Sequence, residues 1–150
     1  MLIRKAVAII SILSVAGCGM FQTPIPAQSC FIIEVSSEPE KLSEFYYGRQ
    51  VVPLIEQFAM SAGLDIAESD SSPQYTYTDT DRGVRVSLSL AVGLGRAAVA
   101  LYSDPEAECS LCNEFDRFML EEVSRYFTVV DCDDDESFST PILYGADLRK

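Results

Sequence analysis

The feature that most constrains this chain is an apolar run of ten residues near its N-terminus, followed by a cysteine. Arg4 and Lys5 form a short basic head, and residues 6–15 are all apolar or small. Ten residues cannot cross a bilayer, which needs about 20, but this is the length of the apolar segment of a secretory signal. We therefore expect residues 1–17 to direct export, so that the rest of the chain folds where cysteines are usually paired.

The cysteine that follows the run lies in the sequence Val15-Ala16-Gly17-Cys18. This sequence resembles the lipobox of bacterial lipoproteins, in which an aliphatic residue and two small residues precede the modified cysteine. The resemblance implies that Cys18 becomes the mature N-terminus and carries acyl chains such as palmitate, which anchor it because each buried CH₂ contributes about 0.8 kcal/mol. Gly19, where an aspartate would imply the inner membrane, implies attachment to the outer membrane with the domain in the periplasm. The alternatives are an ordinary signal peptide with a chance cysteine, and an N-terminal core helix.

The remainder divides into a tether and one domain. Residues 18–29 contain Pro24 and Pro26 and no periodic apolar pattern, so we expect a lipidated tether that reaches roughly 30 Å if extended. Residues 30–150 are expected to form a single α+β domain. Removing residues 1–17 from the 150 leaves 133, enough for one hydrophobic core.

Charge and composition exclude several functions. Arg4 and Lys5 are two of the 11 basic residues, and none of the 23 acidic residues lies in 1–17, so the remaining chain has a net charge of −14. Such an acidic domain is not expected to bind nucleic acid or anionic lipid through a basic patch. Histidine is absent, which removes the usual general base and metal ligand and excludes a Ser-His-Asp hydrolase. We predict no catalytic residue and no cofactor.

Periodicity predicts the elements of the domain. Alternating apolar residues predict strands at 31–35, 75–78, 84–90, 97–102 and 127–132. The first and fourth are each followed by a helix-start sequence in which serine and an acidic residue precede Pro-Glu, at 37–40 and 103–106. We expect a helix from each start, the first ending near Gly63 and interrupted at Pro53. Residues 141–144 form either an edge strand or a docked tail.

This order of elements indicates a ferredoxin-like split β-α-β-β-α-β sandwich, an antiparallel sheet with two helices on one face and 75–78 as an extra edge strand. In that plan the first and last strands are antiparallel neighbours, which brings Cys30 and Cys132 to the same end of the sheet. A bridge there would close about 100 residues and stabilise the fold by about 4–5 kcal/mol. Cys109 and Cys112 would then pair with each other, although four cysteines allow three connectivities.

The sequence Cys109-Ser110-Leu111-Cys112 is the sharpest candidate for chemistry. With a strand before it, a helix after it and a later Thr140-Pro141, it resembles the thioredoxin and glutaredoxin pattern, which implies a thiol-disulfide oxidoreductase using Cys109 and Cys112. Only 28 residues separate Cys112 from Pro141, too few for the helix and strand usual there. A helix starting at Ser103 would also place both cysteines beyond its first turn, away from the amides that stabilise a thiolate. The alternative is a structural pair.

Two kinds of metal site fit some of the residue types, and neither is predicted. A Cys₄ zinc site would require Cys30 and Cys132 to converge on Cys109 and Cys112 without the second Cys-x-x-Cys of zinc ribbons. The acidic run 131–136 could attract calcium, but the EF-hand positions for glycine and glutamate are occupied by glutamate and isoleucine. A solvated acidic turn is the simpler interpretation.

The sequence therefore predicts a non-enzymatic envelope lipoprotein, a binding or structural module, with the thiol-disulfide oxidoreductase as the alternative. Its expected partners are the lipid bilayer, through acylated Cys18, and an envelope protein. The expected binding surface is the sheet face that the helices leave open, which should carry Glu34, Arg85, Ser87 and Ser89. The same four side chains would equally suit a plain solvated face.

Overall fold

The computed structural model describes residues 24–35, 49–66, 74–91, 94–105, 108–138 and 142–144. The expected signal peptide, the lipidation site Cys18 and the helix start expected at 37–40 lie outside these ranges. Among the residues that are described, no helix is both long enough and apolar enough to cross a membrane.

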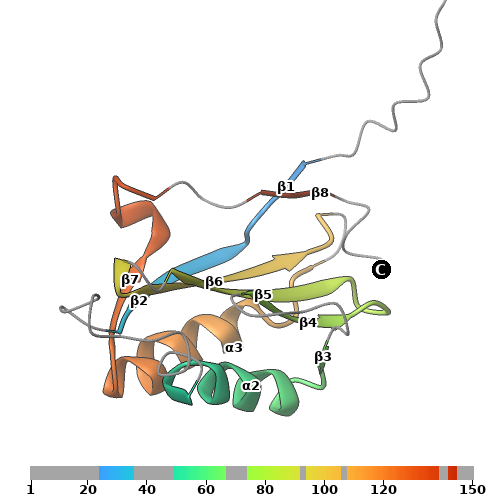
Figure 1. Cartoon of the computed structure of the whole chain (residues 1–150). Coiled ribbons are helices and arrows are strands. Elements are labelled where there is room, and N and C mark those ends of the chain that lie inside the picture. The colour runs from blue at the N-terminus through green and yellow to red at the C-terminus, as the bar shows by residue number, and fades with distance from the viewer. Residues whose placement is uncertain are drawn as a thin grey trace, which may run out of the picture.

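In the described ranges the chain forms a six-stranded sheet, two helical segments and a separate two-stranded ribbon (Figure 1). The strand order in the sheet is β3-β4-β5-β6-β2-β7, and each neighbouring pair is antiparallel. The strands are β2 (Ser29–Glu34), β3 (Asp65–Ile66), β4 (Gln74–Asp79), β5 (Val84–Ala91), β6 (Arg96–Ser103) and β7 (Thr128–Asp131). The ribbon pairs β1 (Pro24–Pro26) with β8 (Ile142–Tyr144). The predicted α+β class is confirmed.

Strand β5 shows how the sequence pattern builds the sheet. Its buried residues alternate with half-buried ones, the buried set being Val84, Val86, Leu88 and Leu90. This alternation is expected of an antiparallel strand with one face on a core. Strand β5 pairs with β6 along its whole length, so the two form the centre of the sheet.

The first helical segment contains the interruption expected at Pro53. Helix α2 spans Val52–Ser61 with Pro53 in its first turn. The two residues before Val51 are also helical, and Val51 is a turn between the two parts. Proline is tolerated in a first turn but not in a helix interior, so the chain begins a new helix where the proline stands.

The second helical segment begins later than the sequence predicts. Ser103, the expected cap, is the last residue of β6, where it pairs with Val84. Helix α3 (Cys112–Arg117) starts after Leu111 and continues as a π-helical turn, η3 (Phe118–Glu122), and a 3₁₀ turn, η4 (Val123–Arg125). The prediction of a helix from Ser103 is wrong, because the eight-residue pairing of β5 with β6 keeps Ser103 in the sheet.

The helices cover one face of the sheet and enclose the larger core (Figure 1). Phe115 of α3 is fully buried at its centre. Its ring centroid lies 5.9 Å from that of Phe31 on β2 and 5.4 Å from that of Phe58 on α2. These distances are typical of aromatic packing. Phe115 therefore packs α3 against both β2 and α2.

A smaller core lies on the opposite face, beneath β1 and β8 (Figure 1). It contains Ile25, Cys30, Ile32, Ala100, Tyr102 and Cys132. Ile25 of β1 is only 3 % exposed. The structure therefore differs from the tether expected over 18–29, because Ile25 finds an apolar site on the sheet and the first strand begins at Pro24.

Gly83 closes the turn between β4 and β5 in a conformation that disfavours other residues. Its φ is +62°, and an added Cβ would lie 3.2 Å from the Cβ of Asp104. We expect Gly83→Ala to lower the free energy of unfolding by about 1–2 kcal/mol through the left-handed backbone alone, with the contact adding to this. Gly63 has a φ of +71°, but its Cβ would meet only the flexible Arg82 guanidinium, at 3.6 Å. Urea unfolding should therefore show a smaller loss for Gly63→Ala, and equal losses would contradict the steric argument.

Candidate functional site

The candidate site is the face of the six-stranded sheet opposite α2 and α3, which we call the open face. The β1–β8 ribbon and the smaller core occupy its part over β2 and β6. Alternate residues of β4 and β5 form the rest, which we call the polar patch: Gln74, Thr76, Thr78, Arg85, Ser87 and Ser89. The predicted residues Arg85, Ser87 and Ser89 thus belong to one surface.

Arg85 lies along the polar patch. Its Nε donates to Ser87 Oγ at 3.3 Å, and its Nη2 donates to Thr76 Oγ1 at 3.4 Å. Thr76 is only 5 % exposed. Across the strands Arg85 pairs with Tyr102; burial raises the pKa of the Tyr102 hydroxyl, and the Arg85 charge partly opposes this. Arg85, Ser87 and Ser89 are half-buried, so the part of the patch that solvent reaches offers hydroxyl groups and one cation to polar or anionic groups.

Glu34 is not brought to Arg85. Glu34 pairs with Arg96 at the start of β6, whereas Arg85 pairs with Tyr102 near its end. Six residues of strand separate these positions, a distance of about 20 Å. The four residues expected to form the binding surface therefore divide into a group of three on β5 and an isolated Glu34.

Arg96 forms ion pairs with two carboxylates at the end of the sheet where Glu34 lies. Its Nη1 lies 2.9 Å from Asp135 Oδ2, and its Nη2 lies 3.7 Å from Glu34 Oε1. Phe138, three residues after Asp135, packs against the smaller core. This ion cluster therefore holds the segment after β7 against the open face.

Asp135 is expected to make the unfolding free energy fall at acidic pH. Its pKa is held below the ordinary value of 3.8, first by hydrogen bonds from the Ser137 hydroxyl and backbone N–H, and then by Arg96. A carboxyl with a lowered folded pKa adds stability above its unfolded pKa and loses it as the pH falls through the folded value. Urea unfolding from neutral pH to about pH 3 should show this loss in the wild type and less of it in Asp135→Asn. Glu136→Gln is the matched control, and identical profiles for Asp135→Asn and the wild type would contradict the assignment.

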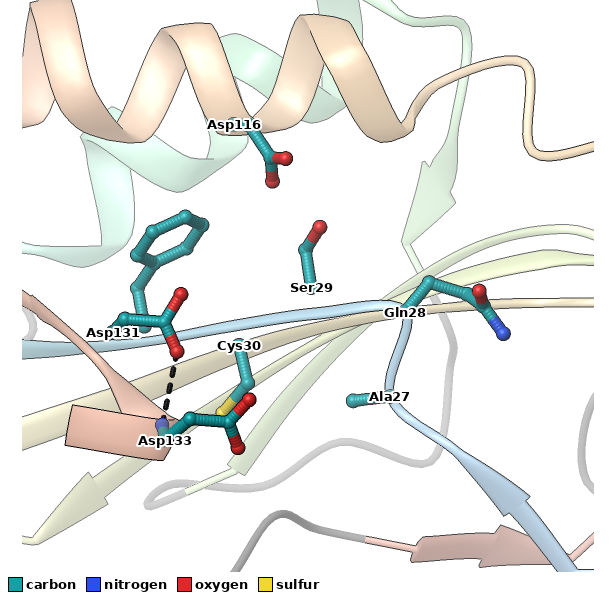
Figure 2. A pocket seen from close by; sticks show the side chains of 8 residues that line it. Ala27, Gln28, Ser29, Cys30, Asp116, Asp131 and Asp133 are labelled. Atoms are coloured by element: carbon teal, nitrogen blue, oxygen red, sulfur yellow. Dashed lines mark hydrogen bonds between the residues drawn. The ribbon is translucent and has the colours of Figure 1, made fainter. Parts of the chain in front are cut away.

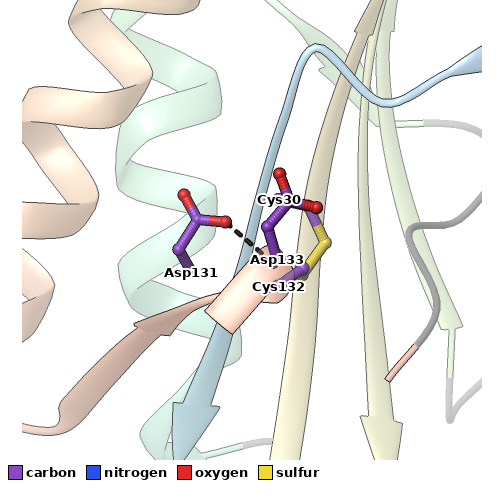
Figure 3. The surroundings of a disulfide bond; sticks show 4 residues. All are labelled: Cys30, Asp131, Cys132 and Asp133. Atoms are coloured by element: carbon purple, nitrogen blue, oxygen red, sulfur yellow. Dashed lines mark hydrogen bonds between the residues drawn. A yellow bond between two sulfur atoms is a disulfide. The ribbon is translucent and has the colours of Figure 1, made fainter. Parts of the chain in front are cut away.

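The first disulfide lies inside the smaller core. Cys30 and Cys132 are bonded with their Cα atoms 5.4 Å apart (Figure 3), and they are 6 % and 1 % exposed. After β7, Cys132 opens a 3₁₀ turn, η5 (Cys132–Asp134), where the Asp131 carboxylate accepts a hydrogen bond from the backbone N–H of Asp133 at 2.9 Å. Because both cysteines are buried, this bridge is expected to be structural and not redox-active.

The second disulfide joins Cys109 and Cys112, whose Cα atoms are 5.5 Å apart. These are the two pairs that the sequence analysis expects. Both cysteines of the second pair are half-buried. Their expected place beyond the first helical turn is wrong, because α3 begins at Cys112 and Cys109 precedes the helix. Glu114 lies in the first turn, and a carboxylate there disfavours a thiolate.

A small polar pocket lies between α3 and the start of β2 (Figure 2). It is lined by Ala27, Gln28, Ser29, Cys30, Phe31, Asp116, Asp131 and Asp133. Asp116 Oδ1 is buried and has no hydrogen-bond partner in the described part of the chain. Within those same ranges, no group of three or more Cys, Asp or Glu side chains has the arrangement of a metal site. The pocket therefore gives no ground for assigning an ion.

Sequence reasoning missed this pocket, although it singled out the acidic run that contributes Asp131 and Asp133. Gln28 lies in the stretch that the sequence predicts to be a tether. Asp116 lies in a helix that the sequence predicts to start at Ser103, whereas α3 starts at Cys112. The missing information is the position of α3 against the start of β2, for which the sequence carries no local signal.

No protein-family model, curated protein or solved structure matches this chain.

Proposed function

We propose that this protein is an envelope lipoprotein, anchored in the outer membrane through acylated Cys18, that acts by binding and not by catalysis. The anchor rests on the lipobox sequence that ends at Cys18, and the pairing of the other cysteines suits an exported compartment without favouring binding over catalysis. Four of the five cysteines are used in two disulfides, and disulfides persist in oxidising compartments such as the periplasm. The fifth, Cys18, is the lipobox cysteine, and the four thiols after it are in bridges.

The proposed binding surface is the polar patch on β4 and β5. Its hydroxyl groups and the guanidinium of Arg85 suit polar groups of the bilayer or of an envelope protein. For the domain that carries it, we propose a ferredoxin-like core formed by β2, α2, β5, β6, α3 and β7. The order β7-β2-β6-β5 among the central strands supports this plan, with β4 and β3 added at one edge.

Labelling with palmitate tests the anchor. In a diderm host the wild-type protein should incorporate labelled palmitate and sediment with the outer membrane, whereas Cys18→Ser should carry no label. The double variant Cys109→Ser/Cys112→Ser is the matched control and should be labelled like the wild type. A wild-type protein that carries no fatty acid, or whose mature form begins at another residue, would refute the proposal.

A thiol-disulfide oxidoreductase is the second candidate, and one observation favours it. Because α3 begins at Cys112, the half-buried Cys109–Cys112 bridge lies at a helix N-terminus and not inside the helix. Amides at such an end stabilise a thiolate, although Glu114 acts against this.

A redox titration separates the two candidates. Disulfide mapping by mass at a series of glutathione potentials should leave the Cys109–Cys112 bridge oxidised if it is structural, since structural bridges have potentials below about −300 mV. A bridge that cycles near the potentials of known oxidoreductases, about −270 to −120 mV, would support the second candidate and contradict the first. Cys30–Cys132 serves as the buried internal reference.

A further inference from the structure

We infer that the open face is turned toward the bilayer and that the phospholipid headgroup layer is the partner of the polar patch, with α2 and α3 on the side facing away. This inference rests on the proposed acylation of Cys18 and adds to it the orientation of the domain. The orientation follows from three features: the position of β1 on the open face, the contacts that hold β1 there, and the short length of chain between Cys18 and β1.

The length of chain before β1 limits the orientations. Six Cα–Cα steps separate Cys18 from Pro24, so the chain between them spans at most about 21 Å. Strand β1 lies on the open face, opposite the helices (Figure 1). With layers about 10 Å apart and helices about 10 Å across, the outer surface of the helices lies roughly 25 Å from the ribbon. The chain would also have to pass around an edge of the sheet, so an anchored domain cannot rest on its helices.

This limit holds only while β1 stays on the sheet. Ile25 packs into the smaller core with Ile32, Ala100 and Tyr102, and burying an isoleucine contributes about 2–3 kcal/mol. The backbone N–H of Gln28 donates to the carbonyl of Leu101 at 2.8 Å. Pro24 and Pro26 have no N–H to donate, so the pairing of β1 with β8 is weakened and the apolar contact of Ile25 is what holds β1 against the sheet itself. If β1 detached, the free chain would extend to Ser29 and span at most about 39 Å, enough to release the constraint.

The charge of the polar patch agrees with this orientation, whereas Glu34, Arg96 and Asp135 form an ion cluster elsewhere on the open face. The positions of β4 and β5 that face it hold no carboxylate and one cation, Arg85. The chain as a whole is strongly acidic, and carboxylates are repelled by the negative surface of a membrane that contains anionic lipid. The polar patch is therefore a part of the domain that can approach phosphate groups without repulsion.

Paramagnetic relaxation tests the orientation. The lipidated protein is purified from host membranes, checked for its acyl groups by intact mass, and placed in phosphatidylcholine nanodiscs that contain a small fraction of lipid with a gadolinium-chelating headgroup. The amides of Thr76, Ser87 and Ser89 should be broadened several-fold more than those of Gln57 and Met60 on α2. Equal broadening, or stronger broadening of α2, would overturn the inference.

Two variants test the cause. Ile25→Asp should remove the difference between the two sets of amides, because it frees β1. Inserting a Gly-Ser segment after Met20, as long as residues 18–23, should do the same without touching a described residue. Met60→Asp, which adds the same charge at a side chain 77 % exposed, is the control and should keep the difference.

The outcomes separate the two proposals. An acylated protein without the difference overturns the orientation alone. A protein without acyl groups overturns the anchor and the orientation together. If the difference survives both Ile25→Asp and the insertion, the chain before β2 does not set the orientation, and the inference is wrong.

Discussion

Replacing Cys30 and Cys132 together with alanine is expected to lower the free energy of unfolding by about 4–5 kcal/mol. The bridge joins residues 102 positions apart, so its loss restores a large conformational entropy to the unfolded chain. Both side chains also belong to the smaller core, where the loss of two buried sulfurs adds to the cost. A domain of this size is typically stable by about 5–15 kcal/mol, so the variant loses a large part of its stability.

The matched variant is Cys109→Ala/Cys112→Ala. Its bridge closes a loop of only three positions, for which the same chain-entropy relation gives about 1.6 kcal/mol. Urea unfolding of both double variants in a Cys18→Ser background avoids thiol exchange in the reference protein. A loss for the Cys30/Cys132 variant no larger than that for the Cys109/Cys112 variant would show that the long bridge does not stabilise the domain in this way.

Phe115→Ala is expected to cost about 3–5 kcal/mol of unfolding free energy, the usual range for a buried aromatic residue. Phe115 is fully buried and contacts Phe31 and Phe58. Its removal leaves a cavity where α2, α3 and β2 meet, which cannot collapse without moving three elements. Urea unfolding measures the loss directly.

Leu120→Ala is the control for Phe115→Ala, because Leu120 on η3 is 56 % exposed. An exposed substitution of this kind changes stability by about 0.5 kcal/mol or less. If Phe115→Ala does not fold, Phe115→Leu keeps most of the buried volume and should show a smaller loss in the same direction. Similar losses for Phe115→Ala and Leu120→Ala would contradict the central role of Phe115.

Local pattern was sufficient to predict most of the sheet. The alternation in 84–90 is a property of neighbouring residues, and β5 occupies that stretch with one residue added. Pairing Cys30 with Cys132 required more, namely an assumed strand order, since spacing alone allowed three connectivities. The start of α3 could not be predicted, because the Ser103 motif competes with a long-range partner, Val84, that no local window contains.

By itself the sequence determined the alternation of the strands and the interruption at Pro53, and it is the source of the proposed export and lipid signal that the tests above examine. Each of these depends on residues close together in the chain. Only the tertiary structure decided that Ile25 packs on the sheet and shortens the expected tether, that Glu34 lies far from Arg85, and that Asp116 meets Asp131 at a pocket. These features depend on which surfaces come into contact when the strands pair and the helices pack. Apolar burial is non-directional, so a local sequence pattern does not specify which surfaces come into contact.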